Sequence, residues 1–239
     1  MYEARRVLDK EIAGLRAVQE RLGTSFVEAV ELLWACSGRV IVTGVGKSGI
    51  VAKKIAATLT STGTRSLYLH PVEAAHGDMG ILAPEDVLLA VSYSGANDEF
   101  DELFSAAARM QIPIVSLTGS GGSRVALSSK VVIDCRVPEE ACPLNLAPTA
   151  STTAALAVGD ALAVALLKKR GFRAEQFALT HPSGVLGRRL VHALVLHAVL
   201  LHEPLAQRPE RLAVDRVGRA VGLVVVLEVA PALARLEPA

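Results

Sequence analysis

Apolar residues at helical spacing mark the first part of the chain. They recur at steps of three and four, at Leu8, Ile12, Leu15, Val18 and Leu22. This spacing places them on one face of a helix. Gly23 breaks the run, and Thr24-Ser25 offers an N-cap for a second helix that ends near Cys36. The pattern predicts a helical segment over residues 1–36 that packs on the rest of the protein.

A different pattern begins at residue 37, where short apolar runs rich in β-branched residues alternate with helical stretches. The runs lie at residues 39–43, 66–69, 87–92, 112–117 and 131–135. Helical stretches lie at 50–59, 98–110 and 123–129, and a long apolar helix is predicted over 151–169. Short continuous strands that alternate with helices are typical of a parallel sheet covered on both faces. We predict one α/β domain over residues 37–190 and a weakly periodic tail over 191–239.

Composition narrows the class of protein. The 239 residues are 51% hydrophobic and 21% charged, which is typical of a globular protein with a filled interior. The net charge is +1 and the basic residues are dispersed, so neither nucleic acid nor an anionic membrane is expected as a partner. Three cysteines without a CxxC pair predict free thiols of a reducing compartment. The charged N-terminus, and apolar runs at 161–167 and 190–201 that are too short to span a bilayer, predict a cytoplasmic protein.

A glycine-rich sequence, Gly44-Val-Gly-Lys-Ser-Gly49, follows the first predicted strand and opens a helix. It is not a Walker A loop, because Ile41 stands where that motif needs a glycine. A dinucleotide fingerprint also fails, because the next strand ends in His70-Pro71 and not in an acidic residue. The sequence therefore predicts an anion-binding loop without a nucleotide.

Two strand-to-helix loops combine into one predicted site. In the first loop the glycines let a ligand approach the backbone at Gly44, and Lys47 and Ser48 add a cation and a hydroxyl to a helix N-terminus. In the second, Ser92-Tyr-Ser-Gly95 ends another strand before the stretch that contains Glu99. Both loops would meet at the carboxyl edge of one sheet, where ligands of open α/β folds bind. This arrangement predicts a phosphate cradle that needs no metal.

Two histidine motifs accompany these loops. His76-Gly77-Asp78 lies in a loop rich in glycine and alanine, where the following glycine leaves the imidazole ring accessible. His181 begins the sequence His-Pro-Ser-Gly after the long helix, and this sequence is also that of a simple turn. Neither motif identifies a chemistry by itself.

The motifs taken together resemble a known family. They are GVGKSG, STGT, HPVEAAHGDMG, SYSGANDE, EEACPLNLAPTASTT and RGFRAEQFALTHPSGVLGRRL. From about residue 30 to 190 the chain resembles the arabinose-5-phosphate isomerases of the KdsD/KpsF type, which have the SIS (sugar isomerase) fold. The ACPLxLAPTxSTT and HPxGxLGRRL stretches are specific to that group, whereas SxSG is common to SIS domains.

The resemblance implies a fold, a reaction and an assembly. The fold is an α/β/α sandwich with a five-stranded parallel sheet, and the assembly is a homotetramer. The reaction interconverts D-arabinose 5-phosphate and D-ribulose 5-phosphate without a required cofactor. Its product feeds 3-deoxy-D-manno-octulosonate synthesis for lipopolysaccharide or capsule.

The resemblance also implies roles for particular residues. By position in the family motifs, the expected catalytic residues are Lys47, Glu99, Glu140 and His181. Together with the first loop it predicts substrate contacts at Gly44, Ser48, Gly63, Thr64, His70, His76, Ser92 and Ser94. Isomerisation needs a base that moves a proton through an enediol, for which His181 or Glu99 would serve, while Lys47 would stabilise the enediolate. His76 would help to open the sugar ring, or would bind an inhibitory zinc ion.

Some features depart from the family. Ala96 stands where many relatives have glutamate, and Ile50 where they have histidine or a similar residue. Most relatives also carry a pair of CBS modules after the SIS domain, and residues 191–239 resemble neither module. Two alternatives are a non-catalytic sugar-phosphate sensor and an isomerase of another sugar phosphate. Sensors usually carry a helix-turn-helix domain, for which the N-terminal segment is too short and too weakly basic, so an enzyme is favoured.

Overall fold

The computed structural model describes residues 1–181. The chain forms two compact units, Met1–Arg173 and Ala174–Ala239. In the second unit the described part is helix α8 (Ala174–Thr180) and His181. The predicted boundary at residue 190, the tail over 191–239 and the motif residues after His181 lie outside the described residues.

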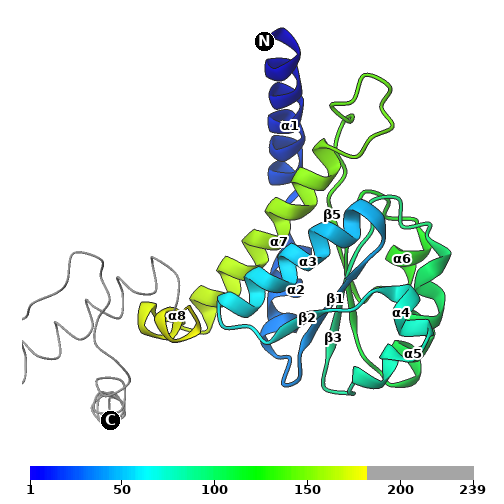
Figure 1. Cartoon of the computed structure of the whole chain (residues 1–239), viewed down its shortest axis with the longest axis vertical. Coiled ribbons are helices and arrows are strands. Elements are labelled where there is room, and N and C mark those ends of the chain that lie inside the picture. Colours follow the sequence, from blue (N-terminus) through cyan, green and yellow to red (C-terminus); the bar gives the residue numbers. More distant parts are fainter. Residues whose placement is uncertain (182–239) are drawn as a thin grey trace, which may run out of the picture. The chain divides into compact units, whose positions relative to one another are not determined.

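A parallel five-stranded sheet with the order β2-β1-β3-β4-β5 forms the centre of the first unit (Figure 1). Its strands are β1 (Val40–Gly44), β2 (Ser66–Tyr68), β3 (Val87–Val91), β4 (Ile114–Thr118) and β5 (Val131–Asp134). In register, Val40 lies opposite both Ser66 and Val87. Each of the five predicted apolar runs forms a strand, so the predicted α/β fold with a five-stranded parallel sheet is confirmed.

Helices cover both faces of this sheet. They are α1 (Tyr2–Arg21), α2 (Thr24–Trp34), α3 (Gly46–Ser61), α4 (Pro71–Ala75), α5 (Asp101–Arg109), α6 (Arg124–Leu127) and α7 (Ala150–Lys169), with 3₁₀ turns η1 (Asp78–Ile81) and η2 (Asp98–Phe100). Val42 and Leu89 point to the core under α2, α3 and α7, whereas Ile41 and Leu88 point to the core under α4, α5 and α6. Successive strand residues point to opposite faces, and burial of both faces explains why the strands are continuously apolar.

The long apolar helix predicted over 151–169 is α7, which begins one residue earlier. It lies against α1, α2 and α3, and Gly159 leaves room for the side chain of Ile55 from α3. It contains the apolar run 161–167, and its whole length and its mean hydropathy of 1.7 also occur in membrane-spanning helices. Half of the helix is buried inside the protein, and a core helix gives the same signal. Packing on three neighbouring helices accounts for most of its apolar character.

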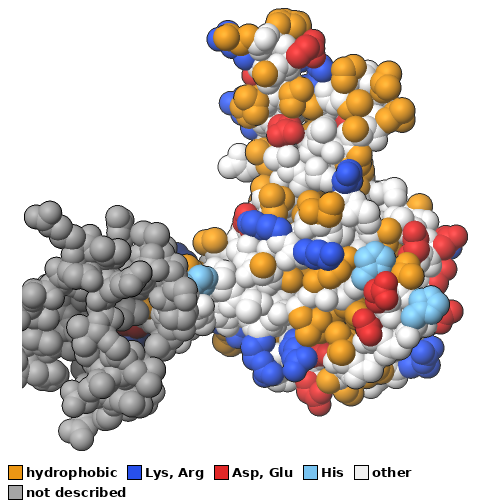
Figure 2. Space-filling model, in the orientation of Figure 1, with side chains coloured by type: hydrophobic (Ala, Val, Ile, Leu, Met, Phe, Trp, Pro, Cys, Tyr) orange, Lys and Arg blue, Asp and Glu red, His pale blue; other side chains and the backbone are white. Residues whose placement is uncertain are grey.

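The N-terminal helices differ in how much of their apolar surface they bury. Gly23 is the N-cap of α2 and Thr24 its first helical residue, so the predicted cap at Thr24-Ser25 is displaced by one residue. On α1 Val18 is buried, whereas Leu8 and Ile12 of the same predicted face are 58% and 46% exposed. Figure 2 shows hydrophobic side chains gathered over α1 and over the β5–α7 connection beside it. This apolar stripe is therefore not fully covered within the first unit.

Candidate active site

The sheet topology creates a crevice between β1 and β3. These strands are neighbours, but the chain leaves β1 toward α3 on one face and leaves β3 toward α5 on the other. Ligands of open α/β folds bind at such a switch point, outside the carboxyl ends of the strands. The loop with Lys47 and Ser48 and the loop with Ser92 and Ser94 lie on the two sides of this crevice.

Close backbone packing fixes the loop after β1. A Cβ atom on Gly44 would meet the carbonyl oxygens of Ser48 and Val91 at 2.9 and 3.0 Å, and one on Gly49 would meet the Gly44 oxygen at 2.7 Å. Gly46 has a φ of 58°, which favours glycine, and its Cβ position faces open space. Gly44 and Gly49 therefore serve the fold of the loop. Substrate contact at Gly44 stays a prediction.

Lys47 and Ser48 lie in the first turn of α3. Lys47 is exposed and forms no ion pair with any residue of 1–181, whereas Ser48 is half-buried. The first turn of a helix carries unpaired N–H groups and a partial positive charge, which attract anions. An unpaired ammonium group at this position suits a phosphate or an enediolate.

The loop after β3 is held together by its own hydrogen bonds. The buried Ser92 hydroxyl accepts a hydrogen bond from Gly95 N–H at 3.1 Å and donates to Asn97 Oδ1 at 3.2 Å. Ser94 is exposed, and its Oγ accepts weakly from Ala96 N–H at 3.4 Å. Ser92 therefore shapes the loop, and Ser94 has the more available hydroxyl of the two.

Tyr93 connects this loop to the segment after β5. Its hydroxyl accepts a hydrogen bond from Val137 N–H at 3.2 Å and donates to Val137 O at 3.4 Å. Its own carbonyl oxygen accepts from Gly119 N–H at 2.9 Å. Tyr93 thus connects the ends of β3, β4 and β5, and no pattern in the sequence predicts this role.

A cavity of about 270 Å³ opens beside these loops. It is lined by Ser48, Val51, Val91, Tyr93, Leu117, Cys135, Val137, Pro138, Glu139, Glu140, Asn145, Leu146, Pro148, Ser151, Thr152 and Ala155. Ser48 and Glu140, two predicted site residues far apart in sequence, thus face the same cavity. A larger groove of about 630 Å³ beside α5 and α6 contains none of the predicted site residues, so the smaller cavity is the better candidate for the chemistry.

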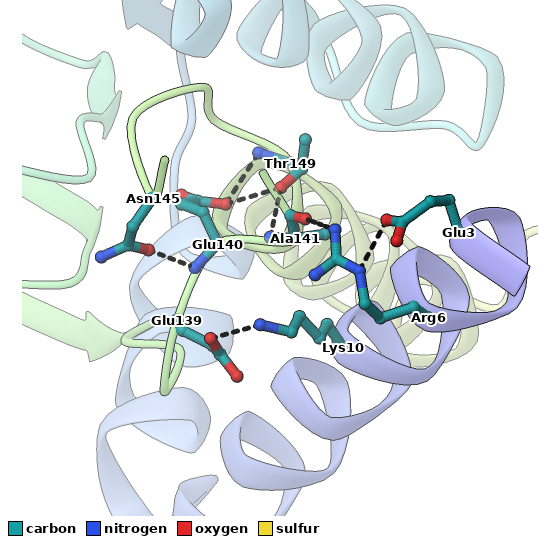
Figure 3. A network of polar contacts seen from close by, with 8 residues as sticks. All are labelled: Glu3, Arg6, Lys10, Glu139, Glu140, Ala141, Asn145 and Thr149. Carbon is teal, nitrogen blue, oxygen red and sulfur yellow. Dashed lines mark hydrogen bonds and ion pairs between the residues drawn. The ribbon is translucent and has the colours of Figure 1, made fainter. Parts of the chain in front are cut away.

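Glu140 is held at the N-terminus of α7 (Figure 3). Its Oε2 accepts hydrogen bonds from Thr149 N–H at 2.8 Å, from the Thr149 hydroxyl at 3.0 Å and from Ser151 N–H at 3.2 Å. Its backbone N–H donates to Asn145 Oδ1 at 2.7 Å, and Ala141 N–H donates to the Thr149 hydroxyl at 2.8 Å. Glu140 therefore caps α7 from outside the helix, although Thr149 occupies the N-cap position.

These contacts keep Glu140 ionised. Burial alone would raise the pKa of its carboxyl group, but hydrogen bonding by Ser151 and Thr149 outweighs burial and lowers the pKa below its ordinary value. The Ser151 hydroxyl lies close enough to contribute to this effect, but its geometry falls short of a full hydrogen bond. Ser151 is 2% exposed, and its Oγ has no partner in the described part of the chain.

The thiols beside the cavity differ in reactivity. Burial, followed by the nearby Asp134 carboxylate, raises the pKa of Cys135 to about 12. Cys135 lines the cavity but is therefore a neutral thiol at physiological pH, which makes it a poor nucleophile. Backbone N–H groups, that of Ala147 foremost, lower the pKa of Cys142 in the loop outside. Both are free cysteines, as is Cys36.

His70 and His76 follow β2 toward the same edge of the sheet. His70 is the N-cap of α4, where its Nδ1 accepts a hydrogen bond from Val72 N–H at 3.2 Å. His76 follows the last residue of α4 and is exposed. Residues 1–181 contain no group of three His, Cys, Asp or Glu side chains that could hold a metal ion. His76 therefore belongs to no three-residue metal site within residues 1–181, and zinc binding there stays a prediction.

Gly63 and Thr64 lie at the opposite edge of the sheet. They precede β2, whose first residue Ser66 pairs with the first residue of β1. This places them about 13 Å from the end of β1, since a strand rises about 3.3 Å per residue. Thr64 is buried, and its Oγ1 accepts a hydrogen bond from Arg170 Nε at 3.2 Å. The structure does not bring these two predicted substrate contacts to the crevice of the same chain.

Glu99 and His181 complete the predicted set. Glu99 lies in η2, is exposed and follows the loop of Ser92 and Ser94. His181 belongs to the second unit, where its ring stacks on Phe177 with centroids 3.9 Å apart. Of the four predicted catalytic residues, Lys47, Glu99 and Glu140 thus belong to the unit that contains the sheet.

The comparisons with known proteins agree with this geometry. The family model described as "SIS domain" matches residues 33–165. The chain belongs to the SIS domain family, a class of proteins with this type of parallel sheet. Within it, the chain is 52% identical to arabinose 5-phosphate isomerase KdsD of Pseudomonas aeruginosa over 80% of its own length and 59% of that protein. It is 50% identical to KdsD of Salmonella typhi over 77% of its length and 56% of that protein.

A solved structure adds a ligand to the comparison. The E. coli CFT073 protein c3406 in complex with arabinose 5-phosphate matches with a TM-score of 0.73 and 37% sequence identity. The match covers 75% of this chain and 95% of that one. The chain spans little more than half the length of the curated relatives that it matches.

Proposed function

We propose that this chain is an aldose–ketose isomerase that interconverts D-arabinose 5-phosphate and D-ribulose 5-phosphate through an enediol. The observation that carries the proposal is its 52% identity with a KdsD isomerase over 80% of the chain. The cavity that joins Ser48 to Glu140 at the carboxyl edge of the sheet supports it. The complex of a relative with arabinose 5-phosphate supports the same substrate class.

Different residues of the site bind the phosphate, stabilise the enediolate, orient the sugar and transfer the proton. The start of α3, with Ser48, and the exposed Ser94 bind the phosphate, and Lys47 stabilises the negative charge of the enediolate. Glu140 remains ionised at neutral pH, which suits a fixed charge that orients the sugar better than a base that must take up and release a proton. The proton-transfer base is His181 or Glu99.

The reaction requires neither a metal nor an organic cofactor, since a cation and helix N–H groups supply the charge stabilisation. The product would feed 3-deoxy-D-manno-octulosonate synthesis for lipopolysaccharide or capsule. Such a biosynthetic enzyme works in the cytoplasm.

The working form is a homotetramer. Leu144 and Leu146 of the β5–α7 connection are 73% and 78% exposed, and Leu8 of the adjacent α1 is 58% exposed. Apolar surface of this kind is typical of contact between chains. If the exposed Gly63 also binds the sugar phosphate, it does so at the crevice of another copy, because it lies at the amino edge of its own sheet. The buried Thr64, which is bonded to Arg170, would then support this segment.

The test is isomerisation of arabinose 5-phosphate by the purified chain in the presence of EDTA. Ribulose 5-phosphate should form, EDTA should leave the rate unchanged, and excess zinc should lower it. Ribose 5-phosphate and glucose 6-phosphate serve as competing substrates. Binding of arabinose 5-phosphate without turnover, in an assay where P. aeruginosa KdsD is active, would favour the sensor alternative and contradict the proposal.

A further inference from the structure

Helix α1 runs antiparallel to the segment that carries Glu140. Its contacts come from Arg6, Lys10, Gly14 and Arg21, at steps of four, four and seven residues, which lie on one helical face. Arg6 contacts Ala141, Lys10 contacts Glu139, Gly14 lies against Val137, and Arg21 contacts Arg136. Because the partner numbers fall as the helix numbers rise, the two segments run in opposite directions. At Gly14 the approach is close, since a Cβ atom there would meet the Val137 side chain at 3.1 Å. One face of α1 thus follows this segment almost residue by residue.

Two of these contacts hold the neighbours of Glu140 on either side (Figure 3). Arg6 donates from Nη2 to the carbonyl oxygen of Ala141 at 3.0 Å, while its Nε pairs with Glu3 at 2.7 Å. Lys10 forms an ion pair with Glu139. The Arg6 and Lys10 side chains are only 23% and 25% exposed. Their carboxylate partners Glu3 and Glu139 are 67% and 54% exposed, so water screens the two ion pairs. Their importance lies in where they hold the segment and not in a large contribution to stability.

The segment needs such support because residues 135–149 form no helix or strand. Their backbone lacks the regular hydrogen bonds that fix a strand or a helix in place. The three hydrogen bonds to Glu140 Oε2 tie the carboxylate to α7, and α1 ties the peptides beside it to the first unit. The position of the carboxylate in the cavity thus depends on residues more than a hundred positions away in sequence.

We propose that Arg6 and Lys10 are positioning residues for Glu140, so that the N-terminal helix belongs to the framework of the active site. The activity part of this proposal rests on the proposed isomerase function. Displacement of a catalytic group by about 1 Å can cost about 10²-fold in rate. The variant Arg6→Ala/Lys10→Ala should therefore lose about 10- to 100-fold in kcat, with a smaller change in KM.

A double-mutant cycle with Glu140→Gln tests the link. If Arg6 and Lys10 act through Glu140, their removal should cost little further kcat once Glu140 is Gln. An equal loss of kcat in both backgrounds would overturn the proposal. Arg16→Ala is the matched control, because Arg16 is exposed on the same helix and has no ion pair among residues 1–181. Arg6→Lys, which keeps a donor and the charge, should recover part of the rate.

Hydrogen exchange separates this proposal from the isomerase proposal. The amides of Thr149 and Ser151 donate to Glu140, so they should exchange faster in Arg6→Ala/Lys10→Ala than in the wild-type chain or in Arg16→Ala. Unchanged exchange at these two amides would contradict the positioning role. If the wild-type chain fails to convert arabinose 5-phosphate, the isomerase proposal fails, and the exchange result still decides whether α1 positions Glu140. Single Arg6→Gln and Lys10→Gln variants replace the double variant in this measurement if the double variant does not fold, and faster exchange at the same two amides is expected in each.

Discussion

The two connections that border the cavity are built in opposite ways. The loop Gly44–Gly49 after β1 is short, and its shape comes from glycines that pack against backbone within the loop and on the neighbouring strand. The connection over 135–149 after β5 is long and irregular, and side chains from α1 and α7 hold it. The conformation of the short loop is set by its own residues and their close neighbours, whereas the conformation of the long connection depends on contacts with other elements.

This difference affects what each functional side chain can do. Lys47 is exposed and has no ion pair in residues 1–181, so its charge is free for the ligand. Glu140 combines two roles, because the carboxylate that faces the cavity also caps α7. Substitution should separate activity from stability at Lys47 and should change both at Glu140.

The largest expected effect is on turnover at the short loop. Lys47→Ala should lower kcat by about 10²- to 10³-fold, the range found when a group that stabilises an oxyanion is removed. Thermal unfolding should stay unchanged, because the side chain is exposed and unpaired within residues 1–181. Glu99→Gln, at another exposed position, should also lower kcat without a change in thermal unfolding. Lys53→Ala, which like Lys47 lies on α3, is the control. A fall in melting temperature that accompanies the loss of activity would assign Lys47 a structural role instead.

A smaller effect should distinguish two glycines of the same loop. Gly44→Ala should reduce the free energy of unfolding by about 3 kcal/mol, because the new Cβ atom meets backbone oxygens that cannot move aside. Gly46→Ala should cost about 1 kcal/mol, from its positive φ alone. Gly46→Asn should cost less, since asparagine tolerates this backbone conformation. Urea unfolding measures all three, and equal losses at the two positions would show that the packing around Gly44 is not tight.

The smallest effect concerns the long connection and depends on pH. Because folding lowers the pKa of Glu140, ionised Glu140 stabilises the protein above the ordinary carboxyl pKa of 4.5, and this contribution is lost as the pH falls through the lowered value. Glu140→Gln should therefore reduce stability by about 1 kcal/mol at pH 7, allowing for partial exposure. The difference from wild type should shrink below about pH 4. Glu20→Gln, an exposed position on α1, should show no such pH dependence, and a constant difference for Glu140→Gln would exclude the ionised cap.

The sequence determined much of the fold because its signals are local. β-branched runs bounded by helical stretches predicted all five strands within a few residues, and Gly44–Gly49 predicted the strand-to-helix loop at the sheet edge. Short-range sterics and the burial of both sheet faces decide these features, so they can be recognised in a window of a few residues. The same local signals predicted the Ser92–Gly95 loop and the long helix after Thr149.

Contacts between distant residues were decided by the tertiary structure alone. Tyr93 holds Val137, and the Thr149–Ser151 turn holds Glu140. The APTAS sequence before an apolar helix is a signal for a helix start, but nothing near it shows that a glutamate nine residues earlier completes the cap. Likewise, Gly63 and Thr64 fall at the amino edge of the sheet because strand direction and order are properties of the whole sheet. A periodic pattern shows which face of a helix or strand is apolar. Only the packing of these elements in the folded chain decides which residues that face contacts.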